Sequence, residues 1–194
     1  MDTHGYTIIL ASGSPRRQHF FEEMGIPFSK KVIPVAEDYP ESLKNTEIAQ
    51  YIVKQKAAPF KALVKENEII ITADTIVWNK NKCLGKPVDA QDATQILQSL
   101  SNTTHQVITA VGFLQKDKWE CIHEVSEVTF GPLSEETIQS YIQTGSPMDK
   151  AGAYGIQDSF GTLNITSISG SYTNIIGLPV AQVLKKIKEI IKNK

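Results

Sequence analysis

Residues 12–17 (SGSPRR) bring hydroxyl side chains, an open backbone and two guanidinium groups into one short turn. The preceding residues 6–10 (YTIIL) have the aromatic and β-branched composition of a short strand. Ser14 followed by proline is typical of a helix N-terminus, which attracts anions. Arg16 and Arg17 can each hold two phosphate oxygens. The turn therefore predicts a polyphosphate site, and the competing interpretation is an ordinary capped helix with two solvated arginines.

Asp74 is the second candidate for chemistry. It follows residues 68–73 (EIIITA), a nearly all-apolar run that predicts a strand buried on both faces. A carboxylate at the end of such a strand is costly to bury unless a cation or a metal ion pairs with it. Ligands of open α/β sheets gather at the carboxyl ends of strands. Asp74 is therefore a candidate general base or metal ligand, and the alternative is an Asp that caps a turn.

Four further segments carry more glycine and charge than folding alone requires. They are Glu37-Asp38 in an acidic loop, Lys56 on a predicted helix, residues 84–87 (LGKP) with Lys86, and residues 149–157 (DKAGAYGIQ). Each signal is weak alone. Together with residues 12–17 and 74 they describe a polyphosphate and metal site, because cations offset the phosphates and carboxylates hold Mg²⁺.

Other catalytic classes leave no motif in this chain. There is no G-x-x-x-x-G-K-[ST] phosphate loop and no G-x-S-x-G nucleophile elbow. The four histidines have no metal-ligand spacing, and we expect each to be a surface or packing residue. These absences argue against a P-loop enzyme and a serine hydrolase.

Composition limits the partners and the compartment. The 194 residues, 41% hydrophobic, predict a single domain over residues 1–194. The 20 basic and 21 acidic residues give a net charge of −1, which disfavours a stable nucleic-acid complex. The two cysteines have no C-x-x-C spacing, and no apolar run has membrane-spanning length. We expect a soluble cytoplasmic protein without a membrane partner.

The apolar periodicity predicts an α/β fold on a mixed sheet. Predicted helices cover residues 15–24, 46 to beyond 56 with an interruption at Pro59, 90–100 after an Asp89 cap, 135–145 after a Ser134 cap, and 179–191. Thr46 is the predicted cap of the second helix. Predicted strands cover residues 6–10, 28–35, 68–73, 75–78 and 163–168, with a hairpin at 105–114 and 119–130. Residues 146–161 are expected to be irregular.

These motifs, in this order, resemble the Maf family of nucleoside triphosphate pyrophosphatases. The resemblance rests on residues 12–17, 73–75 (ADT), 85–87 (GKP), 149–157 and 177–179 (GLP), and it covers nearly the whole chain. It implies a mixed, elongated, twisted sheet with flanking helices and two lobes around a cleft, as in inosine triphosphate pyrophosphatases. It also implies a nucleoside triphosphate substrate, a divalent metal, Mg²⁺ or Mn²⁺, and a homodimer.

The resemblance also assigns residues. Asp74 matches the catalytic acidic residue, and Glu37 and Asp74 match metal-binding positions. Arg16, Thr75 and Gln157 match positions tied to base selectivity, and Glu37, Lys56 and Lys86 match residues around the phosphates and metal. With the turn residues Ser12, Ser14 and Arg17, the predicted substrate-binding residues are Ser12, Ser14, Arg16, Arg17, Lys56, Thr75, Lys86 and Gln157. Residues 149–157 are similar to the branch that acts on dTTP and UTP rather than the 7-methyl-GTP branch. Two departures stand out: Asp158 replaces a usual glycine, and so does Ala110.

The resemblance leaves alternatives open. The expected role is house-cleaning of modified pyrimidine nucleotides, with a link to cell division arrest. One alternative is a non-catalytic, nucleotide-sensing regulator of septum formation, against which the intact Asp74 argues. Another is a pyrophosphatase of the 7-methyl-GTP branch. A metal-ligating carboxylate loses basicity, so Asp74 is either the base or a residue that orients metal-bound hydroxide.

Overall fold

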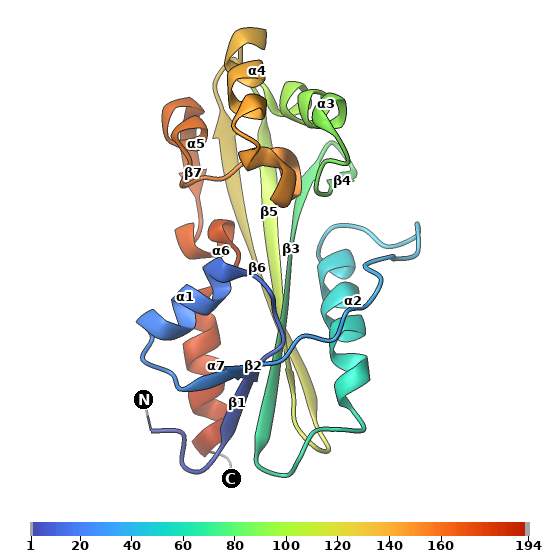
Figure 1. Ribbon diagram of the computed structural model, residues 1–194, viewed down its shortest axis with the longest axis vertical. Helices are drawn as coiled ribbons and strands as arrows, with labels where there is room; N and C mark the ends of the chain where they lie inside the picture. The colour runs from blue at the N-terminus through green and yellow to red at the C-terminus, as the bar shows by residue number, and fades with distance from the viewer. Residues whose placement is uncertain (1, 193–194) are drawn as a thin grey trace. The chain divides into compact units, whose positions relative to one another are not determined.

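The computed structural model describes residues 2–192 and contains one mixed sheet of seven strands (Figure 1). The strands are β1 (Thr7–Leu10), β2 (Phe28–Lys30), β3 (Glu68–Asn79), β4 (Lys82–Leu84), β5 (Thr104–Leu114), β6 (Trp119–Phe130) and β7 (Ile165–Ser169). Their order is β2-β1-β3-β5-β6-β7, and β4 pairs with β3. β1 runs parallel to both of its neighbours, β2 and β3. β4 pairs antiparallel with β3, and β7 pairs antiparallel with β6. The predicted mixed α/β fold with flanking helices is confirmed.

Seven α-helices and three short 3₁₀ helices accompany the sheet within the described residues. The α-helices are α1 (Pro15–Glu23), α2 (Thr46–Ala57), α3 (Ala90–Leu100), α4 (Glu135–Gln143), α5 (Ser159–Asn164), α6 (Tyr172–Ile176) and α7 (Val180–Lys192). The 3₁₀ helices are η1 (Ala58–Phe60), η2 (Ser146–Asp149) and η3 (Ala151–Ala153). Within residues 2–192, no helix is long and apolar enough to cross a bilayer.

The chain divides into two compact units. The first comprises Met1–Asp74, Thr109–Glu124 and Gly177–Lys194, and the second comprises Thr75–Ile108 and Val125–Ile176. β3, β5 and β6 each contribute residues to both units, because a unit boundary falls within each of these strands.

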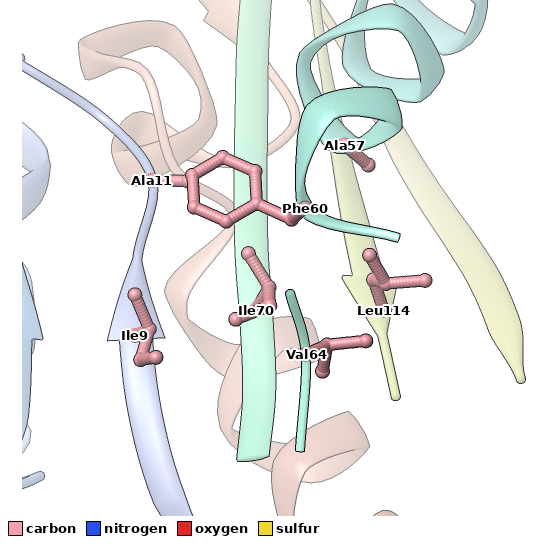
Figure 2. Packing of buried hydrophobic residues seen from close by; sticks show 7 residues of the cluster. All are labelled: Ile9, Ala11, Ala57, Phe60, Val64, Ile70 and Leu114. Carbon is pink, nitrogen blue, oxygen red and sulfur yellow. The ribbon is translucent and has the colours of Figure 1, made fainter. Parts of the chain in front are cut away.

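The first unit packs α2 on one face of its strands and α1 and α7 on the other (Figure 1). One cluster of its core lies between β1, β3 and the α2–η1 segment, and Figure 2 shows its members. They are Ile9, Ala11, Ala57, Phe60, Val64, Ile70 and Leu114, none more than 8% exposed. Pro59 lies in η1, which directly follows α2, so the predicted interruption of this helix is confirmed.

The second unit contains α3, α4, α5 and α6, with β4 and β7. α3 buries the predicted face, Ala93, Ile96, Leu97 and Leu100, and its N-cap is Asp89 as expected. Ser134 caps α4 and accepts a hydrogen bond from the Thr137 amide. Local cap chemistry and helical periodicity therefore predicted these two helices correctly.

Two strand predictions were wrong. The segments 68–73 and 75–78 form one continuous strand, β3, so Asp74 lies inside a strand rather than at its carboxyl end. The strand continues past Asp74 because its later residues pair with β4, Val77 lying opposite Leu84 and Asn79 opposite Lys82. The Asp74 carboxylate inside the strand is paired with Lys56, as described below. β2 stops at Lys30 instead of residue 35, because its pairing partner β1 ends at Leu10, the residue opposite Lys30.

Smaller differences occur at element ends. The N-cap of α2 is Asn45 rather than Thr46, and the Asn45 side chain accepts a bond from the Thr46 amide. The last strand begins at Ile165, because the preceding residues complete α5 and leave Leu163 80% exposed on that helix. The expected irregular segment 146–161 contains η2, η3 and the start of α5, and α6 was not predicted.

Candidate active site

The first unit contains a cluster of three charged side chains, Asp74, Lys56 and Glu37, which runs from the protein interior to the surface. Lys56 Nζ lies 2.7 Å from Asp74 Oδ1 and 2.8 Å from Glu37 Oε1. The Asp74 side chain is 11% exposed, Lys56 17% and Glu37 52%. One ammonium group therefore bridges a buried and an exposed carboxylate, which places three of the predicted site segments in direct contact.

The alternation of β3 explains why Asp74 meets Lys56. Side chains two residues apart on a strand share a face, so Ile70, Thr72 and Asp74 all point the same way. Ile70 packs in the cluster with η1, and Thr72 Oγ1 donates a 3.0 Å hydrogen bond to the Val53 carbonyl of α2. On α2, Lys56 lies four residues after the buried Ile52 and therefore on the same helix face.

Arg17 connects three segments of the first unit. Its Nε donates to the Gly177 carbonyl at 2.9 Å, and its Nη1 donates to the Ala73 carbonyl at 2.9 Å and to Ser12 Oγ at 3.3 Å. The guanidinium group thereby joins the β1–α1 turn to β3 beside Asp74 and to the segment before α7. These contacts give Arg17 a clear role in holding the site together.

The β1–α1 turn has the predicted cap. The Ser14 side chain accepts a bond from the Arg17 amide at 3.4 Å, and Pro15 is the first residue of α1. Ser12 is 6% exposed, and its hydroxyl accepts a 3.3 Å bond from the Ser14 amide. Gly13 is exposed, and a Cβ added there would meet no atom within 4 Å. A ligand therefore has access to this backbone at the N-terminus of α1, beside the half-buried Arg16.

Burial and neighbouring charge act on Asp74 in opposite directions. Burial raises the pKa of the Asp74 carboxyl, while Lys56 and Arg17 act to lower it and Glu37 adds to the increase. The net direction is upward from the ordinary value. Burial also disfavours the charged form of Arg17 and lowers the pKa of its guanidinium, while the negative charge of Asp74 acts to raise that pKa. A carboxylate with a raised pKa is a stronger proton acceptor, which suits a general base.

The carboxylates offer an incomplete donor set for a metal ion. Within residues 2–192, no group of three or more His, Cys, Asp or Glu side chains could hold a metal. The carboxylates of Glu37 and Asp74 nevertheless both contact the ammonium group of Lys56, so they are close together. Mg²⁺ typically takes one or two protein carboxylates and completes its shell with phosphates and water. Two carboxylates therefore fit a metal that arrives with a phosphate ligand.

The remaining predicted residues belong to the second unit. Thr75 follows Asp74 in β3 and is half-buried, Lys86 is exposed after β4, and Gln157 is exposed before α5. The structure thus brings together Ser12, Ser14, Arg17, Glu37, Lys56 and Asp74 in the first unit, joined by the hydrogen bonds and ion pairs above.

Sequence analysis missed the backbone acceptors of Arg17. The Ala73 and Gly177 carbonyls carry no side-chain signal, although residues 177–179 had been noted as a motif. Thr72, which ties β3 to α2, was also missed. The only sequence feature that could have indicated this role was a hydroxyl side chain within an otherwise apolar run.

A mixed α/β protein with a buried carboxylate between cations, beside a helix N-terminus, has the features of an enzyme for phosphate-bearing ligands. The sequence profile described as Maf-like protein matches residues 7–190. The chain belongs to the Maf family.

Relatives with assigned names span almost the whole chain. A dTTP/UTP pyrophosphatase of Flavobacterium johnsoniae is 50% identical over 186 residues, covering 96% of each chain. A dTTP/UTP pyrophosphatase of Bacteroides fragilis is 43% identical and covers 95% of this chain and 96% of the relative. Among solved structures, the Staphylococcus aureus Ham1 protein is 15% identical, with a TM-score of 0.40 over 64% of this chain and 71% of that one. That structural similarity is too low to add to the family assignment.

Proposed function

We propose that this protein hydrolyses dTTP and UTP to the nucleoside monophosphate and pyrophosphate. The observation that carries the proposal is the buried Asp74 carboxylate, 2.7 Å from Lys56 and beside the Arg17-bound turn at the start of α1. The names of the Flavobacterium and Bacteroides relatives support the choice of substrate. Identity of 43–50% over nearly the full length also favours the pyrimidine branch over the 7-methyl-GTP branch.

The charges of the site favour a substrate that brings its own cation. Asp74 and Glu37 together offset Lys56 and Arg17, so these four groups sum to zero. A triphosphate carries several negative charges and is attracted only if further positive charge is present. We assign that charge to Arg16 and Lys86 and to a divalent metal, Mg²⁺ or Mn²⁺.

Glu37 and Asp74 are the proposed metal ligands. The bound metal would neutralise phosphate charge and polarise the phosphorus–oxygen bond that is cleaved. Lys56 contacts both carboxylates and fixes their spacing before substrate arrives. Asp74 accepts a proton from the water that attacks the α-phosphorus, or orients that water, and pyrophosphate leaves. Positioned charges supply most of the rate enhancement in phosphoryl transfer.

Ser12, Ser14 and the amides at the start of α1 are proposed to hold phosphate oxygens, together with Arg16 of the same turn and with Lys56 of α2. Gln157 and Thr75 are the proposed base-recognition residues. A carboxamide donates and accepts at once, which complements the O4 and N3 edge of thymine or uracil. Cytosine reverses this pattern, so dTTP and UTP are preferred.

The proposal also covers the compartment and the oligomeric state of the protein. We place the protein in the cytoplasm as a homodimer, where it removes pyrimidine nucleotides, modified ones included. Light scattering coupled to size-exclusion chromatography tests the dimer. A mass of one 21.5 kDa chain at micromolar concentration would contradict it.

The experiment that tests the activity is pyrophosphate release from dTTP, UTP, CTP, ATP, GTP and 7-methyl-GTP, each with Mg²⁺ and with EDTA. We expect the highest kcat/KM for dTTP and UTP and loss of activity with EDTA. A preference for 7-methyl-GTP would move the protein to the other branch. Binding of nucleotides without turnover in any condition would favour a nucleotide-sensing regulator.

A further inference from the structure

Asp158 is the centre of a polar network inside the second unit. Its Oδ2 accepts hydrogen bonds from the Tyr141 hydroxyl at 2.5 Å and from Ser146 Oγ at 2.7 Å. Lys150 Nζ lies 3.7 Å from the same oxygen. These partners come from α4, from η2 and from the residue before η3, and Asp158 itself is the N-cap position of α5. One carboxylate oxygen therefore joins several segments that surround residues 149–158.

Lys150 is bound within this network. Its ammonium group donates to the Ser146 carbonyl at 2.6 Å, to Ser146 Oγ at 3.0 Å and to Asp149 Oδ1 at 2.7 Å. The Lys150 side chain is 13% exposed. An ammonium group has three donors, and all three have protein acceptors here. The Asp149-Lys150 motif thus supports the loop and does not offer a free cation to a phosphate.

The turn at residues 154–157 is fixed from two sides. The Gly155 amide donates to the Tyr141 hydroxyl at 3.1 Å, and the Asp158 amide donates to the Gly155 carbonyl at 3.1 Å. A Cβ on Gly155 would lie 2.8 Å from the Asp158 carboxylate, so a larger residue here would have to displace that carboxylate from its present position. The Tyr141 ring stacks on Phe160, with centroids 4.3 Å apart and planes inclined by 11°. Burial and the bond to Asp158 raise the pKa of the Tyr141 hydroxyl, which keeps it a donor.

Gln157 lies between Gly155 and Asp158 in the chain. Its side chain is exposed. Its position therefore depends on the backbone on either side of it, which Tyr141 and Asp158 hold.

We propose that Asp158 is a positioning residue for pyrimidine selectivity, acting through Tyr141 and Ser146 on the turn that carries Gln157. This inference rests on the proposed function. Hydrogen bonds discriminate between bases only when the donor and acceptor are held in place before binding. A loosened turn would let the Gln157 amide adapt to several bases, and binding of the preferred base would then have to order the turn.

The test combines kinetics with hydrogen exchange on Asp158→Ala. We expect the ratio of kcat/KM for dTTP to that for ATP to fall about tenfold, the size expected for losing charge-assisted hydrogen bonds. The change should come from a higher KM for dTTP, with kcat within about threefold, because Asp158 does not contact the reacting atoms. Amides of residues 152–158 should exchange faster. Asp158→Asn, which keeps an acceptor oxygen, should restore most of the selectivity.

A double-mutant cycle separates positioning from a general structural role. If Asp158 acts through Gln157, Asp158→Ala should cause no further loss of selectivity in a Gln157→Ala background. Additive losses in the two variants would overturn the proposal, as would unchanged selectivity despite faster exchange. Tyr141→Phe removes only a hydroxyl and should show a smaller loss in the same direction, which keeps the test valid if Asp158→Ala fails to fold.

The matched control is Asp117→Ala, an exposed aspartate in the β5–β6 turn of the first unit. It should leave both selectivity and exchange of residues 152–158 unchanged. Absence of pyrophosphate release from the unmutated protein would refute the proposed function. An active protein whose Asp158→Ala variant keeps its selectivity would refute only the role of Asp158.

Discussion

Lys56 Nζ lies 2.7 Å from Asp74 Oδ1, although the two residues come from α2 and the middle of β3. The contact lets a carboxylate remain inside an otherwise apolar strand, because an unpaired buried charge is strongly unfavourable. It also influences the protonation of the proposed general base, since burial raises the pKa of Asp74 and Lys56 opposes that increase. Stability and chemistry thus depend on the same ion pair.

Asp74→Asn should abolish turnover while the protein still folds, at some cost in stability from the lost ion pair. Asn is nearly isosteric, but it neither accepts a proton nor holds a metal as a carboxylate does. General-base contributions are typically about 10²–10⁴-fold, and loss of a metal ligand adds to this. The measurement is kcat for dTTP with Mg²⁺, with circular dichroism as the check on folding. Activity within about threefold of the unmutated protein would be too small a change for a catalytic base.

The acid limb of the pH–rate profile should depend on Asp74. Only the carboxylate form accepts a proton, and the folded-state pKa of Asp74 is raised above its ordinary value. Activity should therefore fall as pH decreases through this raised pKa, at a higher pH than an ordinary carboxyl would give. Lys56→Met removes the attraction that opposes burial and should move the limb to still higher pH. A limb that does not move would show that a different group controls it.

Substitution of Arg17 should lower stability, whereas substitution of its neighbour Arg16 should lower activity. Arg17→Ala leaves the Ala73 and Gly177 carbonyls without their guanidinium donor, so the free energy of unfolding should fall by about 1.5–3 kcal/mol or more. Arg16→Ala and Lys86→Ala should instead lower kcat/KM for all nucleoside triphosphates alike, because phosphate contacts are independent of the base. Urea denaturation and the nucleotide panel separate the two effects. Equal loss of stability in Arg16→Ala and Arg17→Ala would contradict this division.

Local chemistry made parts of this fold predictable. Ser14, Asp89 and Ser134 were identified as N-caps, and the apolar face of α3 followed from its spacing. Each of these features is set by residues within a few positions of one another. The two strands predicted around Asp74 failed for the opposite reason. The cation that pairs with the Asp74 carboxylate inside this continuous strand is Lys56, 18 positions earlier in the chain.

The same limit applies to the candidate site. The residues of the charged site were visible in the sequence, Asp74 by its place after an apolar run and Glu37 and Lys56 only in combination with the other motifs. The role of Arg17 was not, because its acceptors are main-chain carbonyls 56 and 160 positions away. A backbone carbonyl has no residue-specific signal, so only the three-dimensional structure identifies it. The network around Asp158 was hidden likewise, although the sequence marked Asp158 as unusual.

Gln157→Ala should flatten base preference more than it lowers the best rate. The carboxamide is the proposed partner of the thymine or uracil edge, so its loss removes discrimination and leaves the phosphate site unchanged. The readout is kcat/KM for dTTP, UTP, CTP, ATP and GTP. Thr75→Val should have a smaller effect in the same direction. A clear preference for a purine triphosphate in the unmutated protein would contradict the pyrimidine assignment.

His105 should make the stability of the protein depend on pH. It is 2% exposed, Nε2 lies 2.7 Å from the Tyr154 hydroxyl, and Nδ1 has no hydrogen-bonding partner among residues 2–192. Burial lowers the pKa of His105 to about 4, from 6.5 in an unfolded chain. The unfolded state therefore binds more protons between these values, and stability decreases as pH falls from about 6.5 towards 4.

The loss should approach about 3 kcal/mol near pH 4, given about 1.4 kcal/mol for each pKa unit. His105→Gln keeps a group able to bond the Tyr154 hydroxyl but does not titrate, so it should remove this part of the pH dependence. The matched control is His19→Gln on the exposed face of α1, which removes a histidine without touching His105 and should keep the loss of stability assigned to His105. Urea denaturation of the three proteins from pH 4.5 to 7.5 provides the measurement. Parallel curves for the unmutated protein and His105→Gln would show that His105 is not neutral in the folded state, or that other groups dominate the acid transition.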